Sequence, residues 1–367
     1  SLDDAAAPLE EHRFPCDRCG SDMRFDPGGN RLVCDYCGNV EQVGNVAQPH
    51  PIRELDFQAA LREQLPAAEI EQVRVSRCPN CGALVEFGTD THATTCPFCA
   101  TPVVADTGLH RQIKPRGVLP FTLDESQAHN AMNDWLGSLW FAPNGLRQYA
   151  RNGRKLRGIY VPFWTYDAET RSRYRGERGT IYYETRSVMR DGKRQTVQVQ
   201  RIRWHPVSGR VARFFDDILV LASRSLPKAH TDGLQPWDLS QLVPYTPEYL
   251  AGFEAEGYRV PLEDGFGEAR QIMDQTITRD VMFDIGGDRQ RVHDIQTDVS
   301  DVTFKHVLLP VWMAAYKYRG QSFRFVVNAQ SGRVQGERPY SKIKIALATL
   351  AALIVAAVVG YFYAQYG

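Results

Sequence analysis

The chain has 367 residues, of which 43% are hydrophobic and 23% charged, a composition ordinary for a globular protein and long enough for two or three domains. Its 43 basic and 43 acidic residues cancel, which argues against electrostatic binding of nucleic acid by the chain as a whole. The charges are segregated, however. Residues 1–106 hold 17 acidic and 8 basic side chains, residues 147–213 hold 5 and 17, and residues 229–301 hold 15 and 5.

Residues 1–13 are small and polar, and we expect a flexible lead-in there. All eight cysteines of the chain then follow as one pattern written twice, Cys-x2-Cys-x14-Cys-x2-Cys, with the second copy displaced by 62 residues. They are Cys16, Cys19, Cys34, Cys37, Cys78, Cys81, Cys96 and Cys99. Two Cys-x2-Cys turns aim four thiolates at one point, in the tetrahedral arrangement that zinc prefers.

Three other uses of the cysteines were weighed. Disulfides suit short secreted chains, a thioredoxin-like redox pair needs a single Cys-x2-Cys, and an all-sulfur cage also accepts iron. The matched spacing favours two Zn²⁺ ions, one per four-cysteine site. Such sites have no open coordination position, so we expect them to stabilise structure and not to catalyse. The prediction is zinc ribbons at residues 14–45 and 71–105, separated by a linker at 46–70.

The linker predicts a short amphipathic helix around residues 55–64, and the second ribbon predicts strands at 71–76, 83–87 and 93–95. Residues 112–225 form the next unit. Asp124 followed by Gln127 indicates a capping box that opens a helix, and Pro143 a second short helix. Period-two patterns then predict strands at 159–166, 180–188, 194–203 and 218–222, with a hairpin turn at Asp191-Gly192.

A Pro-rich connector at residues 226–260 leads to a third unit at 261–335, where we expect a helix at 262–282 and strands at 291–296, 302–315 and 322–328. The segment IYVPFW at 159–164 matches VLLPVW at 307–312. This repeat predicts two related α+β halves. A proline inside an apolar strand fits a sheet edge, where another chain could add a strand, but prolines and tryptophans that shape the two cores are favoured.

Residues 345–364 carry no charge over twenty positions, enough to span about 30 Å of hydrocarbon. We therefore expect a transmembrane helix at 343–364, in preference to a buried core helix. Eight Lys or Arg against one acidic residue between Asp301 and this span place the N-terminal domains in the cytoplasm. The chain is predicted to be a single-pass, tail-anchored protein of the inner (cytoplasmic) membrane.

Within the span, small residues recur every four positions on one helix face, which fits either a seam for homo-oligomers or chance in an Ala-rich segment. They are Ala348, Ala352, Ala356 and Gly360.

The basic block at residues 147–213 is interleaved with aromatic residues and permits three uses. It could pair with acidic segments of this chain or of a partner, contact anionic lipid, or bind nucleic acid, and we rank them in that order. The acidic ribbons themselves lack the basic face that phosphate requires.

Motifs for catalysis are missing from the sequence. It contains no GxxxxGK[ST], HExxH or GxSxG, and its histidines are scattered. Surface positions explain the ones that stand out, which are His110, His129, His205 and His293. We therefore expect no enzyme and no catalytic residue, with an unrecognised hydrolase as a distant alternative.

The paired ribbons, the segments YVPFWTYDA, LLPVWMAAYKYRG, PYTPEYLAGFEAE and VVNAQSGRVQGERP, and the C-terminal span together resemble a known group. They look like bacterial membrane proteins with transcription-factor-IIB-type zinc ribbons, often described as primosomal helicase-like. The resemblance covers most of residues 16–364. It implies the eight cysteines as ligands and a partner among SPFH-domain (flotillin-like) proteins or phage-shock-type membrane-stress modules.

The expected fold class is therefore α+β: two small N-terminal zinc ribbons, a mixed α+β body with two related halves, and one C-terminal transmembrane helix. The expected function is a non-enzymatic, membrane-anchored adaptor or scaffold that docks a partner protein, by resemblance an SPFH/flotillin-like one, at the cytoplasmic membrane face. The alternative is a membrane-tethered nucleic-acid-binding protein that uses residues 147–213.

Overall fold

The computed structural model places most of the chain. The residues that it describes are 14–44, 52–80, 82–86, 93–96, 98, 101–104, 109–139, 156–190, 193–318, 321–337 and 341–366. The lead-in at 1–13, the helix expected at Pro143 and the turn at Asp191-Gly192 lie outside these described residues.

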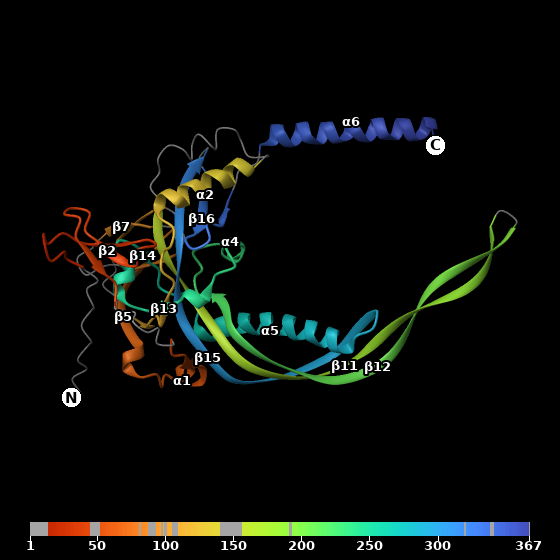
Figure 1. The fold of residues 1–367 in the computed structure, drawn as a ribbon, viewed down its shortest axis with the longest axis horizontal. Helices are drawn as coiled ribbons and strands as arrows, with labels where there is room; N and C mark the ends of the chain where they lie inside the picture. The colour runs from red at the N-terminus through yellow and green to blue at the C-terminus, as the bar shows by residue number, and fades with distance from the viewer. Residues whose placement is uncertain are drawn as a thin grey trace.

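The N-terminal part consists of small antiparallel sheets (Figure 1). Strands β1 (Arg24–Asp26), β2 (Arg31–Val33) and β3 (Val40–Gln42) form the first one. In the second cysteine repeat, β5 pairs with β6 through one half and with β9 through the other, and β7 pairs with β8. Their bounds are β5 Ile70–Arg77, β6 Leu84–Glu86, β7 Ala93–Thr95, β8 Pro102–Val104 and β9 Leu109–Ile113.

The described part of the linker between the two cysteine repeats, residues 52–70, packs against the body. It contains β4 (Leu55–Asp56), α1 (Phe57–Leu61) and a 3-10 turn at Ala67–Glu69. The helix is shorter than predicted because its first residues join the large sheet, where Leu55 pairs with Phe304. The Asp56 side chain caps α1 by accepting a hydrogen bond from the backbone N–H of Ala59 at 2.6 Å.

A nine-stranded sheet forms the body, built around three long strands in the order β12-β11-β15. These are β11 (Arg157–Arg190), β12 (Lys193–Leu221) and β15 (Arg289–Tyr318). Both pairings are antiparallel, and each long strand fuses segments that the sequence predicted as separate strands. The shorter members are β4, β10 (Gly117–Val118), β13 (Val243–Pro244), β14 (Glu254–Ala255), β16 (Gln321–Asn328) and β17 (Val334–Gly336).

Two helices cover the sheet. Helix α5 (Leu262–Ile285) buries a residue at nearly every fourth position from Leu262 to Ile285, which is the stripe that a helix needs to pack on a sheet. Gly265 belongs to this stripe because a Cβ there would lie 2.5 Å from the Tyr166 hydroxyl. Helix α2 (Glu125–Ser138) opens with the predicted capping box, in which Asp124 and Gln127 exchange hydrogen bonds of 2.8 and 2.9 Å.

The two Pro-Trp segments lie side by side in the middle of the sheet. Val161 of β11 pairs with Leu309 of β15, and the registers on either side mirror each other about this pair. Strand β14 runs parallel to β11 at Ile159 and Tyr160, and β10 runs parallel to β15 at Val307 and Leu308.

Neither proline lies at a sheet edge. The carbonyl of Pro162 accepts a hydrogen bond from Ala222 at 3.0 Å, and that of Pro310 from Ala329 at 3.1 Å, while both residues also pair within the β11–β15 ladder. The edge interpretation is therefore wrong, and the prolines shape the core. The neighbouring indoles do so too, because Trp164 donates to the carbonyl of Val260 and Trp312 to that of Leu123.

Beyond Gly179 and Trp204 the β11–β12 hairpin leaves the body as a two-stranded ribbon, because the β11–β15 pairing ends at Gly179. We call residues 180–190 and 193–203 the arm. Figure 1 shows the arm and the C-terminal helix α6 (Lys342–Tyr366) leaving the body on the same side. The remaining short elements are α4 (Lys228–Gly233) and 3-10 turns at Leu239–Gln241 and Pro247–Leu250.

Candidate metal centre

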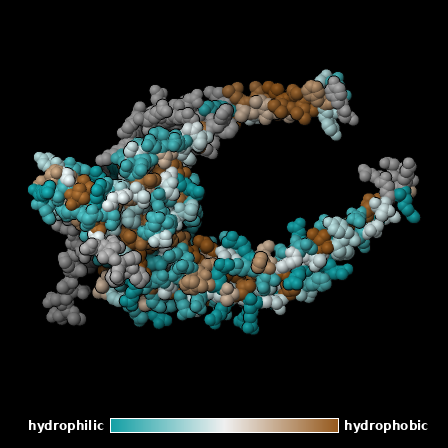
Figure 2. Space-filling model, viewed as in Figure 1, coloured by the Kyte–Doolittle hydropathy of each residue, from teal (hydrophilic) through white to brown (hydrophobic). Residues whose placement is uncertain are grey.

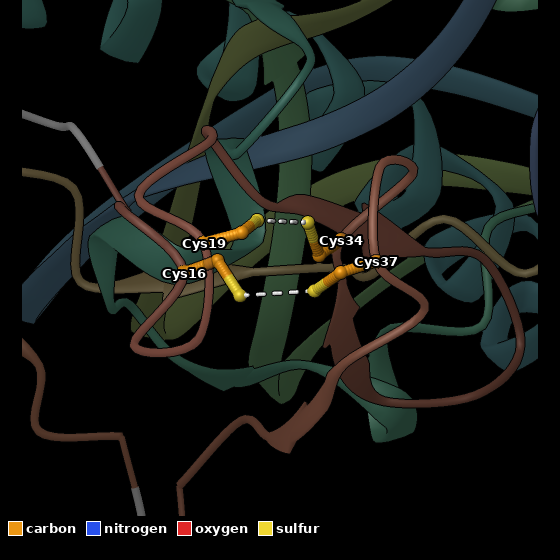
Figure 3. A group of neighbouring side chains, drawn as sticks. All are labelled: Cys16, Cys19, Cys34 and Cys37. Atoms are coloured by element: carbon orange, nitrogen blue, oxygen red, sulfur yellow. Dashed lines mark hydrogen bonds between the residues drawn. The ribbon is translucent and has the colours of Figure 1, made fainter.

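Four cysteines of the first repeat converge on one point (Figure 3). The sulfurs of Cys16 and Cys37 lie 3.5 Å apart, as do those of Cys19 and Cys34, and all four lie within 4.8 Å of one another. A tetrahedron with Zn–S bonds of about 2.3 Å has edges of about 3.8 Å. A disulfide would need a separation of about 2.05 Å. These distances fit a tetrathiolate metal site and exclude disulfides within this group.

The backbone of each Cys-x2-Cys turn explains the convergence. The N–H of Cys16 donates to the carbonyl of Ser21 at 2.8 Å, and the N–H of Gly20 donates back to the Cys16 carbonyl at 2.8 Å. Cys34 and Gly38 repeat this pattern. Gly20 and Gly38 have φ angles of +74° and +71°, which glycine adopts without strain. The glycine after each pair therefore closes a turn that points both thiols inward.

The thiols are crowded enough to resist joint ionisation. The backbone N–H and hydroxyl of Ser21 lower the pKa of Cys19 to about 6. The Asn39 backbone N–H lowers the pKa of Cys37, but desolvation and the neighbouring sulfurs outweigh it and raise that pKa to about 12. Four thiolates this close repel one another unless a cation lies between them. The donor set therefore fits a divalent, thiolate-loving ion such as Zn²⁺.

The first repeat packs on the body through its strand β1. Phe25 is buried with its ring 5.2 Å from that of Tyr249, and its N–H donates to the carbonyl of Ala251 at 2.9 Å. The Tyr249 hydroxyl donates to the Asn30 side chain at 3.0 Å. Cys16 belongs to the same core cluster. The metal site therefore lies at the junction of the first repeat and the body.

The second repeat shares the described features of the first. Cys78 and Cys96 are buried, as are Cys16 and Cys34 at the same positions of the repeat. The backbone N–H groups of Cys78 and Cys96 donate to the carbonyls of Ala83 and Thr101, each at 2.8 Å. Donor and acceptor are five residues apart, as they are at Cys16 and Cys34. Cys81 and Cys99 lie outside the described residues, so a second four-sulfur group is not among the described side chains.

The second repeat also packs on the body. Cys78, Cys96 and Phe98 share a core cluster with body residues that include Leu221 and Trp237. Val85 forms a β-bridge with Glu256. Both repeats are therefore attached to the body by burial and by backbone hydrogen bonds.

The structure also reveals a buried ionic network that sequence reasoning missed. The Lys305 ammonium lies 2.9 Å from Glu54 and 2.7 Å from Asp217, and Thr303 donates to Glu54 as well. Asp167 accepts a hydrogen bond from the backbone N–H of Asp217, and burial raises its pKa to about 7. These residues are separated by up to 251 positions, so no spacing signal could have grouped them. Although Asp167, Asp216 and Asp217 could hold a cation, the Lys305 ammonium already supplies one.

The histidines whose side chains are described give no second site. His205 and His293 are exposed, and His129 is partly exposed beside Glu125, while the side chain of His110 lies outside the described residues. His306, which the sequence did not single out, is buried, and burial lowers its pKa to about 4. It is a neutral core residue beside Trp164.

Many basic side chains of residues 147–213 pair with carboxylates of the acidic segment 229–301. Arg213 lies 2.6 Å from Asp280, and other such pairs are Arg173–Asp298 at 3.8 Å and Arg175–Asp294 at 3.5 Å. These ion pairs lie along β11, β12 and the facing β15 and α5. Part of the basic block is therefore neutralised within the chain.

One helix of the described chain is long and apolar enough to cross a membrane, the stretch Lys344–Tyr363 of α6. None of it is buried, and Figure 2 shows it as a continuous hydrophobic rod outside the body. Exposing the apolar side chains of a helix of this length to water is unfavourable in free energy.

The chain is similar to one curated protein, the "Uncharacterized protein YdjG" of Bacillus subtilis (strain 168). The two are 27% identical over 335 residues, which cover 91% of this chain and 92% of that protein. No model of a known protein family matches the chain, and no solved structure matches it. The similarity therefore extends over nearly the whole chain.

Proposed function

We propose that the chain is a non-enzymatic, membrane-anchored adaptor that holds a partner protein at the cytoplasmic face of the membrane. The observation that carries this proposal is the closed four-thiol group fixed to the body. Four protein ligands fill the coordination sphere of Zn²⁺ and leave no position for substrate, so the ion would serve structure alone. Among the described residues of the body, the charged groups of Lys305, Glu54 and Asp217 are already engaged in salt bridges with one another.

A second Zn²⁺ bound by Cys78, Cys81, Cys96 and Cys99 belongs to the proposal. Its support is the repeated turn geometry at Cys78 and Cys96, together with the φ of +73° at Gly82, which corresponds to Gly20. Both ions would act as clasps that keep the N-terminal sheets rigid on the body.

The body is proposed to consist of two related halves, which are β10–α2–β11–β12 and β14–α5–β15–β16. Matching hydrogen bonds support this. The tryptophan indole of each half donates to the carbonyl that precedes the helix N-cap of the other half, Trp312 to Leu123 and Trp164 to Val260. Both helices begin seven residues after their short strand. An internal duplication accounts for both features.

Helix α6 is proposed as the membrane anchor, with the body on the cytoplasmic side. The excess of Lys and Arg before the helix supports this orientation. Its length and exposure support insertion, because burying its apolar side chains in lipid removes them from water.

The partner-docking surface is proposed to include Tyr36, between the second cysteine pair of the first repeat. Its side chain is 83% exposed, next to the exposed Cys37 on a turn that a bound metal would hold rigid. Exposed aromatic residues on rigid turns are favourable anchors for a partner protein. The resemblance to double zinc-ribbon membrane proteins suggests an SPFH/flotillin-like partner.

The test is co-purification of the detergent-solubilised chain with membrane proteins of its host, followed by mass spectrometry. We expect an SPFH-domain protein with the wild type and its loss with Tyr36→Ala, while metal content stays unchanged. Phe283→Ala is the matched control, because Phe283 is 90% exposed on α5 but lies outside the ribbons. Retention of the partner by Tyr36→Ala would overturn this surface, and absence of any SPFH-domain protein would overturn the partner class.

Nucleic-acid binding through residues 147–213 is the second candidate, and the ion pairs to Asp280, Asp294 and Asp298 count against it. Binding of DNA or RNA whose affinity falls with salt concentration as expected for several phosphate contacts would favour this second candidate.

A further inference from the structure

The arm is longer than the fold requires. In the second half of the body the corresponding hairpin, β15–β16, closes at the pair Tyr318–Gln321, soon after its strands leave the shared core. In the first half the hairpin continues to the pair Arg190–Lys193. Isolated two-stranded ribbons are marginally stable and bury little surface. The arm therefore contributes little to the core, and its length needs another explanation.

The described end of the arm combines exposed apolar and basic side chains. Met189 is 71% exposed, Val188 is 37% exposed, and Arg186 and Arg194 are exposed beside them. No ion pair within the described part of the chain involves Arg194, whereas Arg186 lies 3.2 Å from Glu184. An apolar tip flanked by basic side chains matches the boundary between anionic headgroups and acyl chains.

We infer that the tip of the arm (Val188, Met189 and the surrounding arginines) contacts anionic lipid of the membrane that α6 crosses. This inference rests on the proposed anchoring by α6. The arm and α6 leave the body on the same side (Figure 1). Residues 180–190 span roughly 35 Å at about 3.3 Å per residue. An arm of this length can contact a surface far from the body to which it is attached.

Two other occupants fit the arm less well. Nucleic acid would need several free aromatic faces for base stacking. Guanidinium groups cover the faces of Tyr182 and of Trp204 at the base of the arm, which leaves Tyr183, 63% exposed, as the free one among the described aromatic residues of the arm. Arg203 lies 5.0 Å from the centre of the Tyr182 ring, and Arg291 lies 3.9 Å from that of Trp204. A second copy of the arm would bring like charges together at the tip, at a cost that anionic lipid avoids.

The experiment uses the full chain with Met189 replaced by the photocrosslinker p-benzoylphenylalanine. The chain is reconstituted into nanodiscs of phosphatidylcholine alone or mixed with phosphatidylglycerol, and adducts are identified by mass after illumination. We expect a lipid adduct that is several-fold more abundant with phosphatidylglycerol. Adding Arg186→Gln and Arg194→Gln should reduce it by at least about fivefold, because each basic residue near an anionic surface contributes an affinity factor of that order.

Placing the crosslinker at Phe283 provides the matched control, since that exposed side chain belongs to the body and should give no lipid dependence. A crosslinked dimer, a nucleic-acid adduct, or no adduct at position 189 overturns the arm inference. Co-elution of the chain with nanodiscs is scored separately. Failure to co-elute overturns the anchor and the arm inference together, whereas co-elution without a lipid adduct overturns the arm inference alone.

Discussion

The two cysteine repeats share their spacing and turn geometry, yet the aromatic side chain at one equivalent position is exposed in the first repeat and buried in the second. Tyr36 and Phe98 each precede the last cysteine of their repeat, and they are 83% and 1% exposed. Phe98 packs into a body core cluster, whereas Tyr36 points away from its own. The cysteines fix the local turn, and the side chain between them decides whether that turn is inserted into the body or displayed.

The repeats also use different strands for attachment. The first is held by Phe25 of β1 against Tyr249, and the second by Val85 of β6 against Glu256. The two attachment points on the body are therefore only a few residues apart in sequence. One short segment of the body contacts both repeats, and the second repeat also packs against Leu221 and Trp237.

Metal removal should have the largest effect on this comparison. We expect two zinc ions per chain by elemental analysis, and the loss of one in Cys34→Ser or in Cys96→Ser. Binding of structural zinc is worth on the order of 10 kcal/mol, so each loss should unfold its own repeat. Both variants should lower the melting temperature, because Cys34→Ser releases the buried Phe25 and Cys96→Ser the buried Phe98. Ser21→Ala is the control that should retain both ions, and unchanged zinc in either cysteine variant would contradict the proposal.

The next largest difference between the repeats should come from truncating their two equivalent aromatic residues. Phe98→Ala should cost about 3–5 kcal/mol, as expected for a buried phenylalanine. Tyr36→Ala should change stability by less than about 0.5 kcal/mol, because its side chain is exposed. Thermal unfolding of both variants in detergent measures the difference. Equal melting temperatures would mean that Phe98 is not part of the core.

The network that joins Glu54 of the linker to Lys305 and Asp167 of the body should make the stability of the fold depend on pH. Burial raises the pKa of Asp167 to about 7, whereas the unfolded carboxyl ionises near 4. The folded state therefore holds an extra proton in this window, and stability should fall as pH rises from about 4 to 7. Although burial alone would raise the pKa of Glu54, hydrogen bonds from Asp167 and Thr303 lower it to about 2, so Glu54 adds no slope here.

Melting temperatures measured between pH 5 and pH 8 test this. Asp167→Asn should remove the decline while keeping the acceptor for the N–H of Asp217. Asp216→Asn, an exposed neighbour, should keep the decline. A decline that persists in Asp167→Asn would assign it to another group.

The smallest effect is expected at the hydrogen bond that joins the first repeat to the body. Tyr249→Phe removes the hydroxyl that donates to Asn30 and should cost about 0.5–1.5 kcal/mol. Tyr36→Phe, which removes an exposed hydroxyl, should cost nothing measurable. A Tyr249→Phe protein as stable as the wild type would show that water replaces this bond.

Local features were predictable from sequence because their signal lies within a few residues. The four-thiol group at Cys16–Cys37 follows from spacing, the Asp124 capping box from two residues, and helix α5 from its apolar stripe. The second site stays a prediction, since Cys81 and Cys99 lie outside the described residues.

The continuity of the long strands was not predictable. Between the predicted segments of β11, the inward-facing positions include Thr170 and Ser172, which are buried although polar and which separate the buried Ala168 from the buried Tyr174. Thr170 donates to the carbonyl of Arg213, and Ser172 shares a hydrogen bond of 2.8 Å with Thr297. These bonds replace the apolar contacts that a period-two pattern detects. Hydrophobic periodicity therefore stops where the strand continues.

The placement of Phe25 against Tyr249 and Ala251 has a consequence for biosynthesis. The first repeat leaves the ribosome some 200 residues before the segment that covers it, which at 5–20 residues per second is a delay of about 10–40 s. During that interval its exposed β1 face would depend on the proposed Zn²⁺ for order. Zinc supply during translation would therefore decide whether the nascent chain waits in a native conformation or offers a hydrophobic face to chaperones and proteases.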